Sequence, residues 1–380
     1  MRLRSAFSLG LVAGTLFGGG AVEAQVPGLA WSGSVKSLVL QSRSATGQRF
    51  ELALNRLRIE GKGELAPGLA LDLQYDNELL VGSFLQTAEF RAAKDITAPQ
   101  YWHADANYLE RGDVYGRHRL HRATLTLTAG RVDLKAGRQR IAWGTGRFWS
   151  PLDILNPIGA LALEREERLG VDALLMEVKF GPLSRLGVVV APAPGGGPTS
   201  RAALWHGNAN GVDYSIVAGR VRGLDVVGAD LASQIGQAGV RAEVAHLRDP
   251  RGGGYTRAMS GVDYAFSNGL TVSAEAYYNG AGVRDPARYD SSGVRTGQVV
   301  SLATRYAGIY VSYEITPLLK AVLYGVRNLD DRSRGGDVRL VWSWRPNVEF
   351  TLGTQRFGGA GRTEYGRMPA TSFVQGQWFF

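Results

Sequence analysis

Alternation of apolar and polar residues over about ten positions, followed by a turn, recurs through almost the whole chain. The segments LALDLQYDN (69–77), LTVSAEAYY (270–278) and DVRLVWSW (337–344) show the pattern clearly. Successive side chains of a β-strand point to opposite faces, so each segment has one apolar face and one mostly polar face. The chain is therefore expected to be an all-β protein, and the question is what its apolar faces contact.

The lengths of these segments distinguish a soluble sandwich from a membrane barrel. Sandwich strands are usually five or six residues long, whereas the segments here run nine to twelve residues. A tilted strand needs about that length to cross the hydrocarbon core of a bilayer. The pattern predicts a transmembrane, closed antiparallel β-barrel whose apolar faces contact lipid and whose lumen is polar.

Eighteen strands are expected, and sixteen is the alternative because the patterns at 199–207 and 224–234 are the weakest. The predicted strands are 29–40, 49–61, 68–77, 118–129, 130–142, 169–180, 184–193, 199–207, 212–222, 224–234, 237–248, 257–267, 268–279, 299–314, 317–329, 335–345, 346–357 and 371–380. Short turns are expected at one rim and long loops at the other, as in bacterial outer-membrane barrels.

Two segments interrupt the alternation. In RFELALNRLRIE (49–60) the phase changes near Asn55, which predicts a β-bulge there. Arg138 and Arg140 fall on the face that Val132 gives to lipid. A bulge at Gly137 would return both arginines to the lumen; alternatively, they lie in the headgroup layer and pair with lipopolysaccharide phosphates.

The N-terminus predicts export. Arg2 and Arg4 precede an apolar stretch and then small residues that end at Ala24, the three-part form of a secretory signal. Residues 1–24 are expected to be removed, leaving 25–380 as one barrel domain. The chain has a net charge of +9, and loss of Arg2, Arg4 and Glu23 leaves +8.

Composition excludes several other classes. A mean hydropathy of −0.11 argues against a bundle of transmembrane helices, and 51 glycines argue against a helical protein. The absence of cysteine removes disulfides, thiolate metal sites and attached c-type haem, and no cofactor or metal is expected. Nucleic acid is not expected as a partner in spite of the basic charge, because the protein is expected to be exported.

The chain ends in TSFVQGQWFF, with Trp378 and Phe380 on one predicted face. The last strand must pair with the first, because an open sheet edge is not stable in lipid. This ending resembles the C-terminal strand of bacterial outer-membrane barrels, in which a final Phe is the recognition signal for the barrel-assembly machinery. The resemblance implies an outer membrane location, with the lipid bilayer and lipopolysaccharide as partners.

The segment DLKAGRQRIAWGTGRFWSPLDILNP (133–157) is the least generic in the chain. Its GRQ tripeptide at a strand end, with the Trp-Gly and Asn-Pro loop that follows, resembles porin-like and alginate-export-type barrels. The resemblance implies that this third long loop folds inward and constricts the pore. The expected constriction residues are Trp143, Arg147, Trp149, Asp153, Asn156, Glu164 and Arg165, and Pro157 predicts a short helix within 157–168.

Charged residues on the predicted inner faces give an expectation for the solute. The expected lumen-lining residues are Asp72, Lys135, Arg138, Arg140, Lys179, Arg241, Glu243, Glu275, Arg305, Arg339 and Glu349. The chain has 37 Arg and 6 Lys, and arginine binds carboxylate and phosphate in a bidentate manner. A passive, porin-like channel for small hydrophilic solutes is expected, with anions preferred; mixed charges that only hydrate the wall are the alternative.

Two other functions remain open. The first is a scaffold or sleeve for a partner protein, which aromatic residues of the 78–117 loop, including Tyr101 and Trp102, would bind. The second is an outer-membrane enzyme. It is not expected, because the sequence contains neither HExxH nor GxSxG and its five His are scattered.

Overall fold

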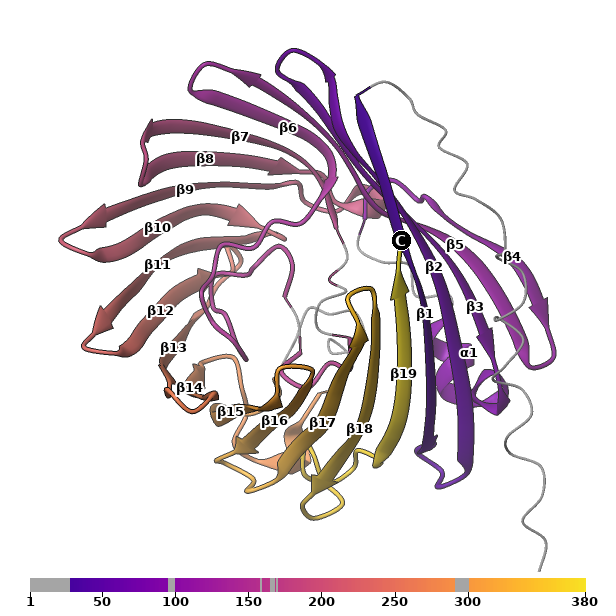
Figure 1. The fold of residues 1–380 in the computed structure, drawn as a ribbon. Helices are drawn as coiled ribbons and strands as arrows, with labels where there is room; N and C mark the ends of the chain where they lie inside the picture. The colour runs from indigo at the N-terminus through magenta and orange to yellow at the C-terminus, as the bar shows by residue number, and fades with distance from the viewer. Residues whose placement is uncertain (1–27, 95–99, 158, 165–167, 169, 291–300) are drawn as a thin grey trace, which may run out of the picture.

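The computed structural model describes residues 28–94, 100–157, 159–164, 168, 170–290 and 301–380. These residues form one closed antiparallel β-barrel, with part of the chain running through its interior (Figure 1). Among the described residues, no helix is long and apolar enough to cross a bilayer.

The strands follow one another around the barrel in chain order. Their bounds are β1 Leu29–Arg43, β2 Arg49–Ala66, β3 Leu69–Val81, β4 Asp105–Arg111, β5 Val114–Ala129, β6 Val132–Gln139, β7 Val171–Gly181, β8 Ser184–Ala191, β9 Ser200–Ala209, β10 Val212–Val221, β11 Leu224–Ile235, β12 Ala238–Arg248, β13 Gly254–Ala265, β14 Leu270–Asn279, β15 Arg305–Thr316, β16 Leu319–Asn328, β17 Arg334–Arg345, β18 Val348–Gly358 and β19 Thr371–Phe379. One α-helix, α1 (Ala88–Ala93), and three short 3₁₀ turns, η1 Ser83–Gln86, η2 Pro194–Gly196 and η3 Pro286–Arg288, complete the described elements.

Eighteen of the nineteen strands make up the barrel wall. β1 pairs with β2 on one side and with β19 on the other, which closes the sheet. β4 pairs only with the first half of β5. The short strand β6 pairs only with the second half of β5, so β4 takes the position next to the first half. Each of the eighteen predicted strands is present, including the two with the weakest patterns, so the expected strand number is confirmed.

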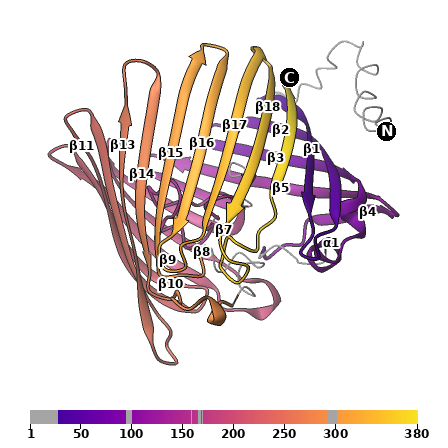
Figure 2. The same cartoon turned by 90° about the horizontal axis from the view of Figure 1, so that it is seen from below.

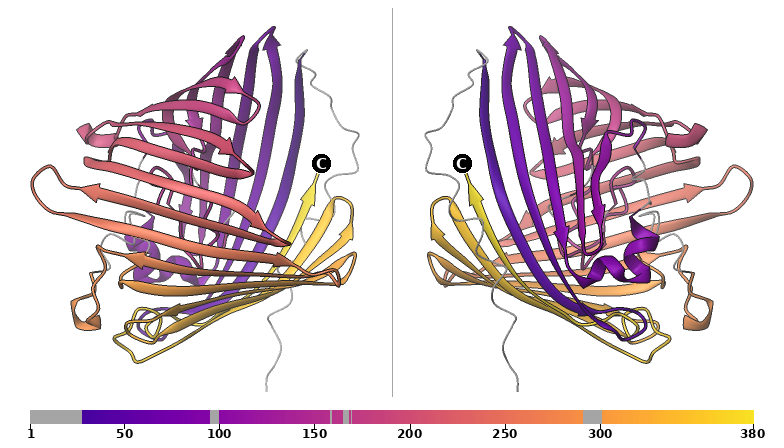
Figure 3. Two further views of the ribbon diagram at one scale, coloured as in Figure 1. Left: turned by 90° about the vertical axis from the view of Figure 1, so that its left-hand side faces the viewer. Right: turned by 90° about the vertical axis from the view of Figure 1, so that its right-hand side faces the viewer.

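The two rims of the barrel differ as expected. The connections at one rim are turns of two to four residues, at 67–68, 130–131, 182–183, 210–211, 236–237, 266–269, 317–318 and 346–347. The opposite rim carries the long segments 82–113, 140–170, 280–304 and 359–370. Figures 2 and 3 show α1 near the end of β1 that lies away from the C-terminus. We call the rim with the short turns the short-turn rim and the rim with the long segments the loop rim.

The outer and inner faces of the wall have opposite polarity. Large apolar side chains such as Val39, Ile216 and Leu352 are about half exposed on the outer face. Charged or polar side chains such as Arg56, Glu243 and Ser273 are buried on the inner face. A water-soluble domain of this size rarely exposes so extensive an apolar surface, which is the arrangement of a barrel in lipid.

The predicted bulge near Asn55 is wrong. β2 keeps an unbroken register with β1 from Arg49 to Gly63. Leu52 and Leu54 face inward, where they pack against a cluster that also contains Phe90 of α1. They are apolar because a loop segment covers them inside the barrel, so no change of phase is needed.

The predicted bulge at Gly137 is also wrong. β6 pairs with β5 and β7 without a register shift. The irregularity lies one strand earlier, where β5 shifts its register against β3 between Arg122 and Leu120. Within the described part of 157–168, residues 157 and 159–164 form turns and no helix, while 158 and 165–167 lie outside the described residues.

Candidate functional site: a loop inside the barrel and a basic cavity

The chain leaves the wall after Gln139, at the end of β6, and crosses the barrel interior before it returns at β7. Figure 1 shows this segment as a magenta trace inside the ring of strands. We call residues 140–170 the inner loop. The carboxylate of Asp153 accepts hydrogen bonds from the Trp143 and Gly144 amides at 2.9 and 3.0 Å and pairs with Arg168 at 2.6 Å. This carboxylate therefore joins the beginning of the loop to its end.

Glu243 on β12 is the first anchor of the inner loop to the wall. Its carboxylate accepts hydrogen bonds from the amides of residues 145, 146 and 152 and from the Ser150 hydroxyl, the last at 2.8 Å. The side chain is only 3% exposed. A buried carboxylate needs several donors to offset its desolvation, and the loop backbone supplies them.

Glu275 on β14 is the second anchor. It accepts hydrogen bonds from the amides of residues 147, 148 and 149, with distances of 2.8 and 3.4 Å to the last two. Arg241 on β12 forms an ion pair with the same carboxylate at 2.8 Å. Sequence reasoning expected both glutamates on the inner face, where they lie. Their carboxylates are bound to the loop, however, so they do not face a passing solute.

Two apolar clusters fix the loop between these anchors. Leu152, Ile154 and Leu155 pack on inward side chains of β7–β12, among them Val189 and Val217. On the other side, Phe148 and Trp149 pack on inward residues of β13–β16. Trp149 stacks on Tyr277 with a centroid distance of 5.4 Å and an interplanar angle of 3°. The inner wall here is apolar because the loop covers it.

The far part of the loop contacts β1, β2, β17 and β18. Glu164 pairs with Lys36 at 2.7 Å and with Arg56 at 3.0 Å. Burial of Glu164 acts to raise the pKa of its carboxyl, but the two cations outweigh burial and hold that pKa below its usual value. Arg339 and Gln355 donate hydrogen bonds to the loop carbonyls of residues 163 and 161. The inner loop is thus held at points around most of the lumen.

The expected constriction residues mostly hold the loop in place. Asp153, Asn156 and Trp149 are buried, and Asn156 accepts a hydrogen bond from the Ile141 amide at 3.2 Å. Arg147 lies over the Tyr310 ring at 4.3 Å and remains partly exposed. Arg165 lies outside the described residues.

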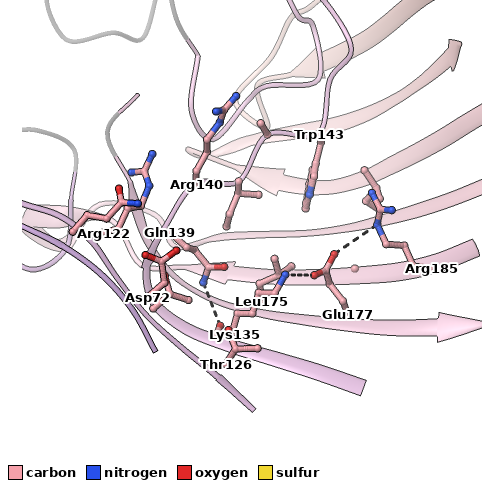
Figure 4. A pocket seen from close by; sticks show the side chains of 16 residues that line it. Asp72, Arg122, Thr126, Lys135, Gln139, Arg140, Trp143, Leu175, Glu177 and Arg185 are labelled. Carbon is pink, nitrogen blue, oxygen red and sulfur yellow. Dashed lines mark hydrogen bonds and ion pairs between the residues drawn. The ribbon is translucent and has the colours of Figure 1, made fainter. Parts of the chain in front are cut away.

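A cavity of about 380 Å³ remains between the first part of the inner loop and the wall, on the side toward the short-turn rim (Figure 4). It is lined by Asp72, Gln74, Arg122, Thr124, Thr126, Lys135, Gln139, Arg140, Ile141, Ala142, Trp143, Leu175, Glu177, Arg185, Gly187 and Leu204. Four of these side chains are cationic and two are carboxylates, so the lining has a net positive charge.

The charges in the cavity differ in how far they are neutralised. Lys135 pairs with Glu177 at 2.5 Å, and Arg185 lies 3.6 Å from the same carboxylate (Figure 4). Arg140 is exposed and forms no ion pair with any described residue. The cavity can therefore offer an uncompensated guanidinium to an anion, a group that recognises carboxylate and phosphate well.

The other expected lumen residues divide into three groups. Strand alternation places Asp72, Lys135, Lys179, Arg241, Arg339 and Glu349 on the inner face, together with the two anchoring glutamates. Arg140 follows β6 and lines the cavity. Arg138 and Arg305 lie elsewhere.

The expectation that Arg138 lines the lumen is wrong. Its guanidinium pairs with Asp172 at 2.9 Å and donates to the carbonyls of Leu120 and Trp102, and the residue is 1% exposed. It lies within the wall, at the end of β6, where the segment before β4 fills the space between β5 and β7. Asp172 neutralises it there, so neither a bulge nor a lipid phosphate is required.

The expectation that Arg305 lines the lumen is also wrong. Its neighbours Tyr306 and Tyr310 are buried on the inner face of β15, so Arg305 points outward. It pairs with Asp330 at 2.8 Å near the loop rim. The error arose because bulky tyrosines on this strand face the lumen, where they contact the inner loop.

Sequence reasoning missed two groups of inward arginines. Arg122 and Arg185 line the cavity, the first beside the register shift in β5 and the second directly after a turn. Nearer the loop rim, Arg56, Arg58 and Arg117 surround the buried carboxylates of β3, and Arg56 and Arg117 contact Glu78 at 2.7 and 2.6 Å. Arg56 and Arg58 alternate with Leu57 and Ile59, a signal that would have identified them.

Comparison with known proteins supports the fold. No family model matches the chain, and no curated protein matches it. Among solved structures, Pseudomonas aeruginosa OccK5 (OpdH) is similar with a TM-score of 0.61 and 10% identity, over 93% of this chain and 98% of that one. OccK11 (OpdR) of the same organism has a TM-score of 0.58 and 12% identity, over 93% of this chain and 96% of that one. The structure of OpdK from that organism with vanillate has a TM-score of 0.55 and 11% identity, over 92% of this chain and 98% of that one. At these identities the likeness concerns the porin-like barrel fold.

Proposed function

We propose that this protein is a channel of the bacterial outer membrane through which small hydrophilic solutes pass passively. One observation carries the proposal: the barrel is apolar outside and charged inside, and its inner loop leaves a basic cavity of about 380 Å³. The apolar outer face fits a bilayer, and the N-terminal segment 1–24 fits an export signal. The solved structures that share the fold include a protein named as an outer membrane protein.

Single-channel recording tests this proposal. Purified protein added to a planar bilayer is expected to produce discrete, uniform conductance steps in KCl. A preparation that is folded, as judged by β-sheet circular dichroism, and that produces no steps would contradict a channel function.

The alternative functions find less support in the interior. A sleeve needs a lumen wide enough for a partner segment, whereas the inner loop already occupies this lumen. For an enzyme, His206 lies 3.2 Å from the Ser215 hydroxyl, and Asp230 is hydrogen-bonded to the same serine. In a catalytic triad the acid orients the histidine instead. The resemblance to alginate-export-type barrels rests on the segment 133–157 alone, so we do not extend the proposal to that solute.

A preference for anions follows from the cavity charges and gives a testable variant. The wild-type channel is expected to show an anion-selective reversal potential across a KCl gradient. Arg140→Glu with Arg185→Glu reverses two cavity charges and is expected to lower the anion/cation permeability ratio severalfold, because the reversed charges face the solute in a poorly screened space.

The matched control reverses two arginines on the outer face, Arg201→Glu with Arg248→Glu. Their strand neighbours Ala202 and Leu247 are buried inside, so these side chains point away from the lumen. The control is expected to keep the wild-type reversal potential. Cation preference of the wild-type channel, or equal shifts in both variants, would contradict the anion proposal.

We also propose that the C-terminal strand is the signal for barrel assembly. Phe380 exchanges two backbone hydrogen bonds with Gly33 of β1, at 2.8 and 3.0 Å. Its ring covers Gly33, where an added Cβ would lie 2.6 Å from the ring. Phe380→Ala is expected to reduce the heat-modifiable, folded form in outer membranes severalfold, whereas Phe379→Ala, at the preceding position, is expected to leave it near wild type. Equal assembly of both variants would contradict this role.

A further inference from the structure

A groove of about 580 Å³ lies on the outer face of β15–β18, near the loop rim. Strand alternation shows that it opens outward, because the intervening residues Tyr306, Tyr310 and Asp337 are buried inside. The inner loop and the channel path lie on the other side of the wall. The groove therefore has no part in the proposed passage of solutes.

Two cross-strand rows of residues form the groove. The row nearer the loop rim runs Ala307, Arg327, Arg334, Gly358 across four strands. The next row runs Ile309, Gly325, Gly336, Arg356. Gly325 and Gly336 are direct neighbours, and their missing side chains make the depression.

The charges at this groove are unbalanced. Arg327, Arg334 and Arg356 are exposed, and none forms an ion pair with a residue in the described part of the chain. The two acidic residues between β16 and β17 already have partners: Asp330 is bound to Arg305 at 2.8 Å, and Asp331 accepts hydrogen bonds from the Ser333 hydroxyl and the Glu364 amide. Another outward set, Arg201, Arg220 and Arg248, differs because Asp225 lies among its members. Three unpaired guanidiniums around one depression favour an anionic ligand.

The outer surface below the groove is apolar. On the side toward the short-turn rim, the next rows present Leu323, Val338 and Leu340, each between 38% and 48% exposed. A ligand that fits both surfaces has an anionic head at the arginines and a hydrocarbon chain that runs over the glycines onto these residues. That chemistry is a phosphorylated acyl lipid.

We propose that the groove binds a phosphorylated lipid of the outer leaflet, the lipid A part of lipopolysaccharide. The inference rests on the proposed outer-membrane location, in which the loop rim faces the cell surface. The arginines bind a phosphate of the lipid, and one acyl chain lies over Gly325 and Gly336. Free phosphate would use only the arginines, and a zwitterionic lipid would lack the net charge.

Native mass spectrometry of the detergent-solubilised full chain tests the site, with diphosphoryl lipid A as the probe. The wild type is expected to retain one lipid A. Arg327→Ala with Arg334→Ala and Arg356→Ala is expected to weaken retention about tenfold or more, since each arginine supplies a charge-assisted hydrogen bond. The control, Arg201→Ala with Arg220→Ala and Arg248→Ala, removes the same charge elsewhere and is expected to retain the lipid.

A second variant separates shape from charge. An added Cβ at Gly336 would have its nearest contact at 3.6 Å, so Gly336→Leu fits the wall and fills the depression. It is expected to weaken lipid A retention while all three arginines remain. Inorganic phosphate is expected not to displace the lipid, and phosphatidylethanolamine is expected not to replace it.

The results can also overturn the inference. Equal retention by the groove and control variants, unchanged binding by Gly336→Leu, or displacement by inorganic phosphate would each contradict it. Conductance steps recorded from the same preparations keep the two proposals separate. Normal steps without lipid retention would remove the lipid site and leave the channel function intact.

Discussion

Replacement of residues 144–165 by a short glycine–serine linker is expected to raise the single-channel conductance severalfold. The inner loop crosses the lumen and contacts the wall from β7 to β18 and at β1 and β2, so its removal enlarges the narrowest part of the path. Trp143, directly before the deleted segment, and Arg168, three positions after it, both contact Asp153. These two residues therefore lie close together, so a short linker can connect the chain on the two sides of the deletion.

The deletion also has an expected cost in stability. Val189, Val217 and Ala245 are fully buried against the loop and would become exposed to water in the lumen. At about 25 cal/mol per Å² of apolar surface, this exposure lowers the free energy of unfolding. Strand pairing remains, so the barrel is expected to fold with a lower melting temperature.

A matched control for the loop deletion is the same linker in place of residues 194–197, which form an outer connection at the loop rim. The control is expected to keep the wild-type conductance. If the 144–165 deletion conducts as the wild type does, while circular dichroism shows a folded barrel, the inner loop is not the constriction.

The double variant Glu243→Ala with Glu275→Ala is expected to release the inner loop and leave the barrel closed. The two carboxylates accept hydrogen bonds from six loop amides, those of residues 145–149 and 152. Each hydrogen bond to a charged group contributes about 1.5–3 kcal/mol. Without these acceptors the amides are better solvated by water than buried, and the loop leaves its position.

Current fluctuation and proteolysis measure the release. The double variant is expected to show rapid transitions between conductance levels and faster cleavage after Arg147 by trypsin. Glu177→Ala is the control for cleavage, because it removes an inward carboxylate whose ion partners, Lys135 and Arg185, lie on strands. Its inner loop is expected to stay protected. Equal protection of the double variant would show that the apolar clusters alone hold the loop.

The strands could be predicted from sequence because their pattern is local. A strand in this wall has lipid on one face and a polar interior on the other, so its residues alternate whatever its neighbours are. Even 224–234, with one of the weakest patterns, corresponds to β11. The errors arose where this rule fails. Leu52 and Leu54 face inward and pack in a cluster with Phe90 of α1. Tyr306 and Tyr310 face inward and belong to the apolar cluster around Phe148 and Trp149 of the inner loop.

The candidate site was predicted less completely, for a related reason. The sequence predicts that the loop 143–168 lies inside the barrel, with Arg147, Asp153, Asn156, Glu164 and Arg165 as its charged and polar residues. Whether a polar side chain faces a solute or a backbone amide depends on contacts between residues that are far apart in the chain. Glu275 and Phe148, for example, are separated by 127 positions. No local pattern can report such a contact.

By itself, the sequence determined that this chain forms a long-stranded barrel with two unlike rims and an apolar outer face. Each of these properties follows from the alternation of neighbouring residues and from the lengths of the connections between strands. Only the tertiary structure decided which of the predicted lumen charges remain available to a solute. Glu243 and Glu275 are used by the inner loop and Arg138 by Asp172, whereas Arg140 stays without an ion partner in the described chain. The physical reason is that a buried charge is neutralised by whichever donors or acceptors the folded chain brings to it.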